Sequence, residues 1–233
     1  MISIIIPAYN ESNRIEKVLG EYAKYFLDKH QEFEIIVVCD GTDNTAEVVS
    51  NISKKYTNVK LLEYSYKLGK GGGIIEGFKS SKGDIVGFVD ADDAVTPAQY
   101  EILINSVSDC DCVIGSRRMN GSVIIQRQPL IREVLSKCLN LLVNGLFNLK
   151  IKDTQCGAKI FKRNVIEKVL PKLKLTGFEF DIELLWKIKN ENFLIKEVPI
   201  TWSHTDESSF LLKYIPKMFI NLIRLRVGLL KGI

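Results

Sequence analysis

The chain has 233 residues, of which 46% are hydrophobic and 26% charged, so it can bury a full core and has no composition typical of long disorder. A formal charge of +4 is too small to indicate a nucleic-acid-binding protein, and we expect no nucleic-acid partner. No uninterrupted apolar run reaches about 18 residues, so we expect no transmembrane helix, and the first residues form a strand pattern instead of a signal peptide.

The first half of the chain alternates short apolar runs with helical patterns. Strands are predicted at residues 2–6, 34–39, 59–63, 85–89 and 112–114. A helix between the first two strands is predicted by the spacing of Ile15, Val18, Leu19, Tyr22 and Phe26. Asp43 or Thr42 is expected to cap the next helix, and Thr96, followed by Pro97, a third. This alternation predicts an α/β fold with an open, doubly wound, mostly parallel sheet flanked by helices.

The second half is less regular. Residues 116–128 are polar and are predicted to form a mobile loop. Helices are expected at 129–147 and 178–189, a strand at 192–202, and a closing helix at 216–231. Five cysteines form no CxxC pair and are interpreted as reduced, buried thiols of a cytosolic protein: Cys39, Cys110, Cys112, Cys138 and Cys156.

Ligands of doubly wound sheets bind beyond the carboxyl ends of the strands, which directs attention to the residues there. The first strand ends in Pro-Ala-Tyr-Asn-Glu-Ser at 7–12, not in the GxGxxG turn of a dinucleotide-binding protein. An ordinary turn in which Asn10 or Ser12 caps a helix is the alternative interpretation. Asp40 follows the second strand, where its carboxylate can accept hydrogen bonds from a nucleobase.

The strongest signal is the acidic run Asp90-Ala91-Asp92-Asp93, which follows the fourth strand. Residues two apart in a strand share a side, so Asp90 and Asp92 can both face one divalent cation, Mg²⁺ or Mn²⁺. Such an ion neutralises the diphosphate leaving group of a nucleotide-sugar. An acidic turn with a helix cap is the alternative, because DxD alone is common.

The run Lys-Leu-Gly-Lys-Gly-Gly-Gly at 67–73 precedes a helical pattern. Lys70 and Gly71, at a helix N-terminus, can cradle a phosphate, although the Gly-Lys-Ser/Thr ending of a Walker A loop is absent. A plain flexible turn explains the run equally well.

Taken in order, these motifs resemble the family-two inverting glycosyltransferases with the GT-A fold. Further motifs resemble the dolichyl-phosphate sugar synthases within that family, above all the β-glucosyltransferase type: Gly-Ser-Arg at 115–117, Arg132 with Ser136, Asp-Thr-Gln-Cys-Gly at 153–157, Phe-Asp-Ile-Glu-Leu-Leu at 180–185 and Ile-Arg-Leu-Arg at 223–226. The resemblance covers nearly the whole chain. It implies transfer of a hexose, glucose or mannose, from UDP-glucose or GDP-mannose to a polyprenyl or dolichyl phosphate.

The resemblance also implies roles for individual residues. Nucleotide-sugar binding falls to Pro7, Tyr9, Glu11, Asp40, Lys70, Gly71, Asp90, Ala91 and Asp92, with the metal on Asp90 and Asp92. Arg117 and Arg132 would hold the lipid phosphate, and Asp153 and Asp181 would lie near the reacting centre. For the last two the alternative is structural, as a turn cap and as an ion-pair partner respectively.

A catalytic domain is expected over residues 1–207, with a nucleotide-sugar-binding half at 1–115 and an acceptor-binding half at 116–207. Residues 208–233 are expected to form an amphipathic helix. Its stripe of Met218, Leu222, Leu225 and Leu229 lies opposite Lys217, Arg224 and Lys231. That pattern predicts peripheral binding at the cytoplasmic face of a membrane, with packing of the stripe on the protein's own core as the alternative.

A phosphate acceptor is already ionised and needs cationic positioning, whereas an alcohol acceptor needs a general base. A family-two transferase with a soluble or polysaccharide acceptor would therefore use Asp153 or Asp181 as base. A nucleotidyltransferase would have a basic, glycine-rich loop after the first strand, which this chain lacks. A catalytically silent sugar-nucleotide-binding or scaffold protein is the remaining alternative, and the Asp90 and Asp92 pair argues against it.

Overall fold

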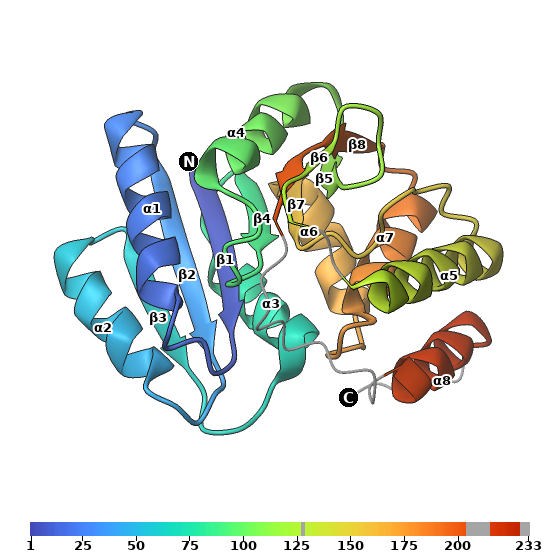
Figure 1. Cartoon of the computed structure of the whole chain (residues 1–233), viewed down its shortest axis with the longest axis horizontal. Helices are drawn as coiled ribbons and strands as arrows, with labels where there is room; N and C mark the ends of the chain where they lie inside the picture. Colours follow the sequence, from blue (N-terminus) through green and yellow to red (C-terminus); the bar gives the residue numbers. More distant parts are fainter. Residues whose placement is uncertain (127–128, 204–214, 229–233) are drawn as a thin grey trace.

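The computed structural model describes residues 1–126, 129–203 and 215–228 (Figure 1). The strands are β1 (Ile2–Ala8), β2 (Phe33–Cys39), β3 (Val59–Glu63), β4 (Ile85–Val89), β5 (Cys112–Ser116), β6 (Val123–Ile124), β7 (Ala158–Lys162), β8 (Ile195–Pro199) and β9 (Thr201–Trp202). The α-helices are α1 (Ile15–Asp28), α2 (Thr45–Lys55), α3 (Gly69–Ser80), α4 (Pro97–Ser106), α5 (Leu130–Phe147), α6 (Arg163–Val169), α7 (Phe180–Asn190) and α8 (Ile215–Arg226). Short 3₁₀ turns follow α4 and α6 at Val107–Asp109 and Leu170–Lys172.

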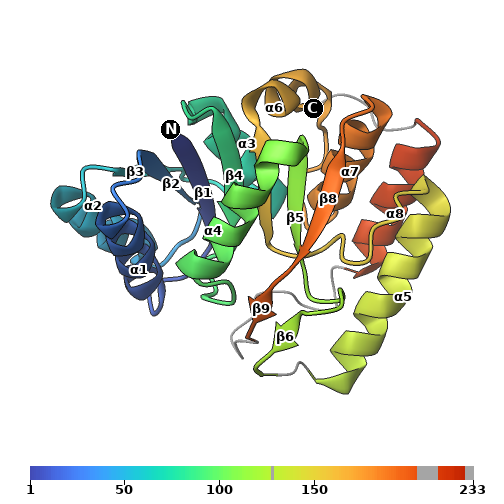
Figure 2. The same cartoon turned by 90° about the horizontal axis from the view of Figure 1, so that it is seen from above.

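The central sheet has seven strands in the order β3-β2-β1-β4-β7-β5-β8. All neighbouring pairs are parallel except those of β7, which runs antiparallel to both β4 and β5. Figure 2 shows α1, α2 and α4 over one face of the sheet and α3, α6 and α7 over the other. The expected doubly wound, mostly parallel sheet is confirmed.

The five strands predicted in the first half are all present, because their apolar runs are covered on both faces. Every residue of β2 is buried, whereas edge strand β3 buries only Val59. Pro7 is tolerated in the central strand β1 because it lies beyond Ile2–Ile5, the part of β1 that pairs with β4. The pairing of β1 with β4 ends before Pro7, near the carboxyl edge of the sheet.

Strand β7 was not predicted, and it occupies the middle of the sheet. Its sequence, Ala-Lys-Ile-Phe-Lys, carries two lysines, and Lys159 is fully buried. A lysine can be buried in a core strand only when it has hydrogen-bond or ion-pair partners. Its ion-pair partner here lies far away in the sequence, so a local sequence pattern does not reveal it. Because β7 inserts between β4 and β5, the proposed halves 1–115 and 116–207 share one sheet. The proposed boundary at 207 lies outside the described residues.

Helix starts differ in detail from the expected ones. Thr96 caps α4 as predicted, its hydroxyl accepting the Gln99 N–H. Asn44 occupies the cap position of α2, but the Asp43 carboxylate still accepts the Thr45 N–H from one residue earlier. The glycine run does not precede α3 but forms its first turns from Gly69 onward.

Two segments of the second half were misjudged. Residues 116–128, predicted to be a loop, contain β6, which pairs in parallel with β9. The single strand expected at 192–202 is divided into β8, in the main sheet, and β9, in this second small sheet. Of the five free cysteines, four are buried as expected, but Cys138 on α5 is exposed.

Helix α8 packs against the body of the protein beside α5 (Figures 1 and 2), and the Arg226 Nε donates to the Leu146 carbonyl at 2.8 Å. The expected membrane-facing stripe is wrong for its described members. Met218, Leu222 and Leu225 are at most 5% exposed, because this face of α8 packs on the body of the protein. Leu229 and Lys231 lie outside the described residues. No helix in the described part of the chain is long and apolar enough to span a bilayer.

Candidate active site

The acidic residues predicted for the donor site gather beyond the carboxyl ends of β1 and β4. These two strands are neighbours at the point where the connections reverse direction across the sheet. Glu11 follows β1, whereas Asp90 and Asp92 follow β4. The charges of Asp90 and Asp92 both contribute to raising the pKa of Glu11, so the three carboxylates share one electrostatic environment.

Asp90 is anchored between β4 and β7. Its N–H donates to the Gly157 carbonyl at 3.1 Å, and its carboxylate lies where a side chain on Gly157 would be. A Cβ on Gly157 would stand only 1.9 Å from Asp90 Oδ2. The glycine of the Asp-Thr-Gln-Cys-Gly motif therefore provides the space that Asp90 occupies.

Asp92 lies deeper, and its Oδ1 accepts the Ala94 N–H at 3.1 Å. Ala91, between the two carboxylates, is buried. Burial, followed by the charge of Asp90, raises the pKa of Asp92 to about 6. A carboxylate destabilised by burial and by a like charge is stabilised when a cation binds, so the electrostatics of this pair fit a divalent metal.

Glu11 also pairs with Arg14, one helical turn along, and its N–H donates to the Thr45 hydroxyl at 2.8 Å. Burial raises the pKa of Glu11 despite the hydrogen bond from Arg14. Arg14 therefore balances part of the negative charge at this edge of the sheet.

Asp40 closes the second corner of the site. Its Oδ2 accepts the N–H groups of Leu68 (2.7 Å) and Gly69 (2.9 Å), at the start of α3. The anion at this helix N-terminus is thus the protein's own carboxylate. Nearby, the Lys67 ammonium lies 3.5 Å from the centre of the Tyr9 ring, which makes a cation–π contact at the rim.

Lys70 links the donor side to the acceptor side. Its Nζ lies 2.9 Å from Asp90 Oδ1 and 3.4 Å from Asp181 Oδ2. Burial acts to lower the pKa of Lys70, but the charges of Asp181 and Asp90 raise it overall. Asp181 also receives a 2.5 Å hydrogen bond from Lys159, so the alternative prediction of an ion-pair partner for Asp181 is confirmed.

Gly71 has a packing role in the same region. A Cβ there would lie 2.4 Å from the Cβ of Phe180, so only glycine lets α3 approach α7 this closely. Its predicted contact with the nucleotide stays a prediction.

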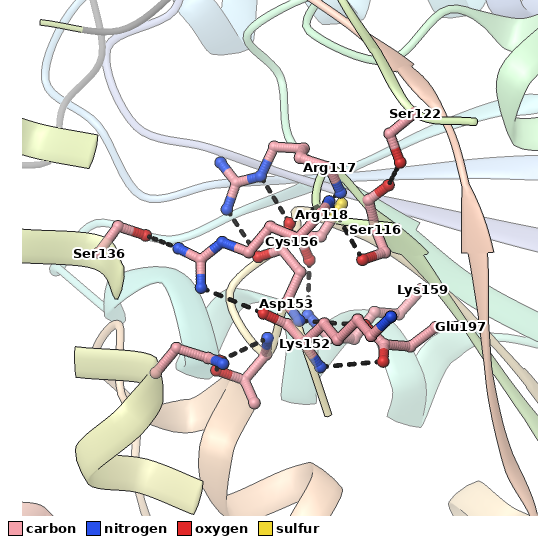
Figure 3. Close-up of polar contacts among 12 residues, drawn as sticks. Ser116, Arg117, Arg118, Ser122, Ser136, Lys152, Asp153, Cys156, Lys159 and Glu197 are labelled. Atoms are coloured by element: carbon pink, nitrogen blue, oxygen red, sulfur yellow. Dashed lines mark hydrogen bonds and ion pairs between the residues drawn. The ribbon is translucent and has the colours of Figure 1, made fainter. Parts of the chain in front are cut away.

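The acceptor side is organised by Arg117 and Asp153, which the sequence placed 36 residues apart (Figure 3). Arg117 Nε and Nη2 donate to the two carboxylate oxygens of Asp153 at 2.7 and 2.8 Å, and its backbone N–H adds a third bond. Glu197 on β8 accepts the N–H groups of Lys152 and Asp153 and so holds this turn. Burial raises the pKa of Asp153, but Arg117 outweighs burial and holds it below its usual value.

Arg118 was not singled out from the sequence. Its Nη2 donates to the Ser136 hydroxyl on α5 at 2.7 Å, and its Nη1 to the Lys152 carbonyl at 3.1 Å (Figure 3). The signal in the sequence was the doubled arginine directly after β5. The side chain of Arg132, four residues before Ser136, lies outside the described side chains.

Asp90 and Asp92 fit a metal site in which phosphate oxygens of a substrate supply the remaining ligands. No group of three or more His, Cys, Asp or Glu side chains within the described residues is arranged to hold an ion. Mg²⁺ and similar ions are, however, commonly bound by one or two carboxylates together with phosphate oxygens and water. Asp90 and Asp92 are suited to such a site, whereas a closed, all-protein metal cage is not supported.

Comparison with known proteins gives consistent results. The family model of glycosyl transferase family 2 matches residues 3–170, more than half of the chain. A dolichyl-phosphate beta-glucosyltransferase of Saccharomyces cerevisiae is 34% identical over 255 residues, which cover 100% of this chain and 76% of the yeast protein. The protein of the same name from Dictyostelium discoideum is 31% identical, over 100% of this chain and 76% of its own length.

Among solved structures, glucosyl-3-phosphoglycerate synthase from Mycobacterium tuberculosis, in complex with Mn²⁺, UDP-glucose and phosphoglyceric acid, has a similar fold. The TM-score is 0.72 at 18% identity, over 98% of this chain and 80% of that one. At this identity the likeness concerns the fold.

Proposed function

The chain belongs to glycosyl transferase family 2, and from that premise we propose that it transfers glucose from UDP-glucose to a polyprenyl phosphate such as dolichyl phosphate, with inversion. The relatives at 30–34% identity that carry the name dolichyl-phosphate beta-glucosyltransferase support this acceptor class. The GT-A-type fold supports a nucleotide-sugar donor.

The acceptor assignment depends on one observation: both carboxylates that could act as general base, Asp153 and Asp181, are engaged in ion pairs. Asp153 is neutralised by Arg117, which keeps its pKa low, and a carboxylate with a lowered pKa is a weak base. Asp181 is held between Lys159 and Lys70. An alcohol acceptor needs a base that both carboxylates are poorly placed to supply. A phosphate, mostly dianionic at neutral pH, attacks without one.

The geometry of Asp40 favours uracil over guanine in the donor. A guanine presents two adjacent N–H donors, which match the two oxygens of a carboxylate, whereas uracil presents a single N–H. Asp40 Oδ2 already accepts two backbone N–H groups, and Oδ1 has no hydrogen-bond partner among the described residues. One available acceptor oxygen matches the single donor of uracil. Pro7, Tyr9 and Glu11, beside Asp40, are proposed to complete the nucleoside site.

Asp90 and Asp92 are proposed to hold Mg²⁺ or Mn²⁺ together with the donor diphosphate, with Ala91, Lys70 and Gly71 beside it. When bound, the ion stabilises the negative charge of the departing nucleotide. Lys70 contacts Asp90 directly, so its ammonium is placed to neutralise diphosphate oxygens on the same side. Arg117 and Arg132 are proposed to orient the acceptor phosphate, since arginine suits phosphate geometry.

The protein is further proposed to bind peripherally at the cytoplasmic face of a membrane, through a face of α8 different from the one expected. Exposed apolar residues lie on α8 and directly after it, and on the neighbouring α5: Phe219, Ile220, Ile223 and Val227, with Leu130, Val134, Leu135 and Leu141. Lys217, Arg224 and Arg226 are also exposed on α8. Exposed apolar side chains together with exposed basic ones on a helix are typical of contact with anionic lipid headgroups.

The function is tested by incubating the protein with Mn²⁺, a polyprenyl phosphate and labelled UDP-glucose or GDP-mannose, followed by organic extraction. Label from UDP-glucose should enter the organic phase, only when the lipid phosphate and metal are present. Equal or greater transfer from GDP-mannose would overturn the choice of donor. Transfer only to soluble acceptors would favour the rival transferase. A catalytically silent protein would bind the nucleotide-sugar without any turnover.

A further inference from the structure

The basic residues of the acceptor side differ in how their charge is balanced. Arg117 is neutralised by Asp153, and Lys159 by Asp181. Arg118 is balanced differently. Its guanidinium donates to a hydroxyl and a backbone carbonyl, both neutral, and it forms no ion pair with any carboxylate that the structure describes.

The surroundings of Arg118 make this unbalanced charge costly. The side chain is half-buried, and burial lowers its pKa, as does the positive charge of Arg117 next to it. Glu133, Asp153 and Glu197 act on it only from a distance. A partly buried guanidinium with neutral partners and a like charge beside it is stabilised when an anion binds.

The position of Arg118 indicates what kind of anion. Ser136, to which it donates, lies on α5, and the same helix exposes Leu130 (76%), Val134 (56%) and Leu141 (76%) to solvent. Helix α5 therefore carries the hydroxyl partner of Arg118 on one face and exposed apolar side chains on another, and a ligand with a charged head and a long apolar tail would use both. Arg117 pairs with Asp153, and Gly157 of the same segment accepts the Asp90 N–H, so the head would lie toward the donor metal site.

We propose that Arg118 is a direct ligand of the acceptor's phosphate group, oriented by Ser136, with the isoprenoid chain lying along the exposed apolar residues of α5. Arg117, whose charge is balanced by Asp153, helps to orient the phosphate as proposed above, whereas Arg118 supplies the net positive charge. This assignment rests on the proposed function, because it presumes a lipid phosphate acceptor.

The test compares Arg118→Gln with Lys137→Gln, which removes the same charge from an exposed position on α5. With polyprenyl phosphate in detergent micelles, Arg118→Gln should raise the acceptor KM roughly tenfold to a hundredfold, as expected for loss of a charge-assisted hydrogen bond. The UDP-glucose KM and the melting temperature should stay unchanged, and Lys137→Gln should behave as wild type. Arg118→Lys should recover part of the loss, since it keeps the charge but not the planar fork.

A second measurement separates the sources of a phosphate group and does not require turnover. Calorimetry with dodecyl phosphate, in the presence of UDP and Mn²⁺, should show binding to wild type that is weakened by Arg118→Gln. Sedimentation with phosphatidylglycerol vesicles should be equal for both proteins.

An unchanged acceptor KM and unchanged dodecyl phosphate affinity would overturn the assignment. Loss of vesicle binding with an unchanged KM would also overturn it, because Arg118 would then contact lipid headgroups. A lower melting temperature with both KM values raised would show that Arg118 only ties α5 to the loop at Lys152. If wild type transfers nothing to polyprenyl phosphate, the proposed function fails, and dodecyl phosphate binding still decides whether Arg118 holds a lipid phosphate.

Discussion

The donor and acceptor sides of this site balance charge in opposite ways. On the donor side, Asp90 and Asp92 stand close together with an excess of negative charge, and burial with the charge of Asp90 raises the pKa of Asp92 to about 6. On the acceptor side, Asp153 is matched to Arg117 and buried with it. A site with excess charge has electrostatic energy to gain from a ligand, whereas a matched pair serves mainly the protein.

This contrast predicts that changes on the donor side impair activity and spare stability, and that changes to the matched pairs do the reverse. Arg118 differs from the paired residues of the acceptor side, because its partners are a hydroxyl and a carbonyl, and for this reason we assign its charge to the acceptor phosphate. Four substitutions test the contrast.

The largest expected effect is that of Asp92→Ala. Loss of a metal-holding carboxylate should reduce transfer roughly 10³-fold, equivalent to several kcal/mol. The melting temperature should stay the same or rise, because a buried carboxylate beside a like charge is removed. Transfer kinetics, Mn²⁺ titration and a thermal melt measure this. Full activity with normal metal dependence would refute the metal assignment.

Asp153→Asn should act on stability first. The substitution leaves Arg117 buried without its carboxylate, which typically costs roughly 3 to 5 kcal/mol of unfolding free energy. Urea unfolding measures the loss. Glu21→Gln, which removes an exposed ion pair with Lys17, is the matched control and should change stability by no more than about 0.5 kcal/mol. Equal effects of the two substitutions would break the comparison.

The same pair has a pH signature. Because the pKa of Asp153 is lowered in the folded protein, its contribution to stability is present above the ordinary pKa of 3.8 and is lost as the pH falls through the lower folded value. Wild type should therefore lose stability more steeply on acidification than Asp153→Asn. Parallel acid profiles would contradict the assigned cause.

Gly157→Ala tests the junction between the two sides. The added methyl group would meet Asp90 Oδ2 at 1.9 Å, and the flexible carboxylate can move away, so the fold should survive while the site is displaced. Transfer should fall on the order of 10²-fold, as for a 1 Å misplacement of a reacting group. Gly145→Ala in α5, where a Cβ meets nothing within 4 Å, is the control and should keep full activity. An active Gly157→Ala enzyme would show that the position of Asp90 is not critical.

The smallest effect is expected at the membrane surface. Phe219 is 45% exposed on α8, and Phe219→Ser should weaken binding to anionic vesicles about fivefold, since a half-exposed aromatic ring contributes roughly 1 kcal/mol on burial. Ile102→Ser, at a similarly exposed apolar residue on α4, is the control. A vesicle sedimentation assay compares them, and equal binding by all three proteins would exclude this face of α8.

The donor side could be predicted from the sequence because its information is local. Each of β1, β2 and β4 is an apolar run followed at once by its polar residues, and parallel strands bring their carboxyl ends to one edge. Asp40, Asp90 and Asp92 therefore lie where the pattern of runs and endings placed them. Their neighbour Glu11 was also placed correctly, whereas its pairing with Arg14 was not foreseen.

Only the tertiary structure decided the rest. Lys159 can be buried because its ammonium donates a hydrogen bond to Asp181, 22 residues away, and Arg117 likewise donates to Asp153, 36 residues away. The helical period of α8 predicted an apolar stripe that includes Met218 and Leu222, and this stripe was expected to face a membrane. In the structure these two residues face the core, whereas Phe219 and Ile220 face outward. Helical periodicity shows which residues share a face but not what covers that face, because burial is decided by neighbouring elements such as α5. For the same reason the unbalanced charge of Arg118 became visible only from its contacts with Ser136 and Lys152 and from the pairing of its neighbour Arg117 with Asp153.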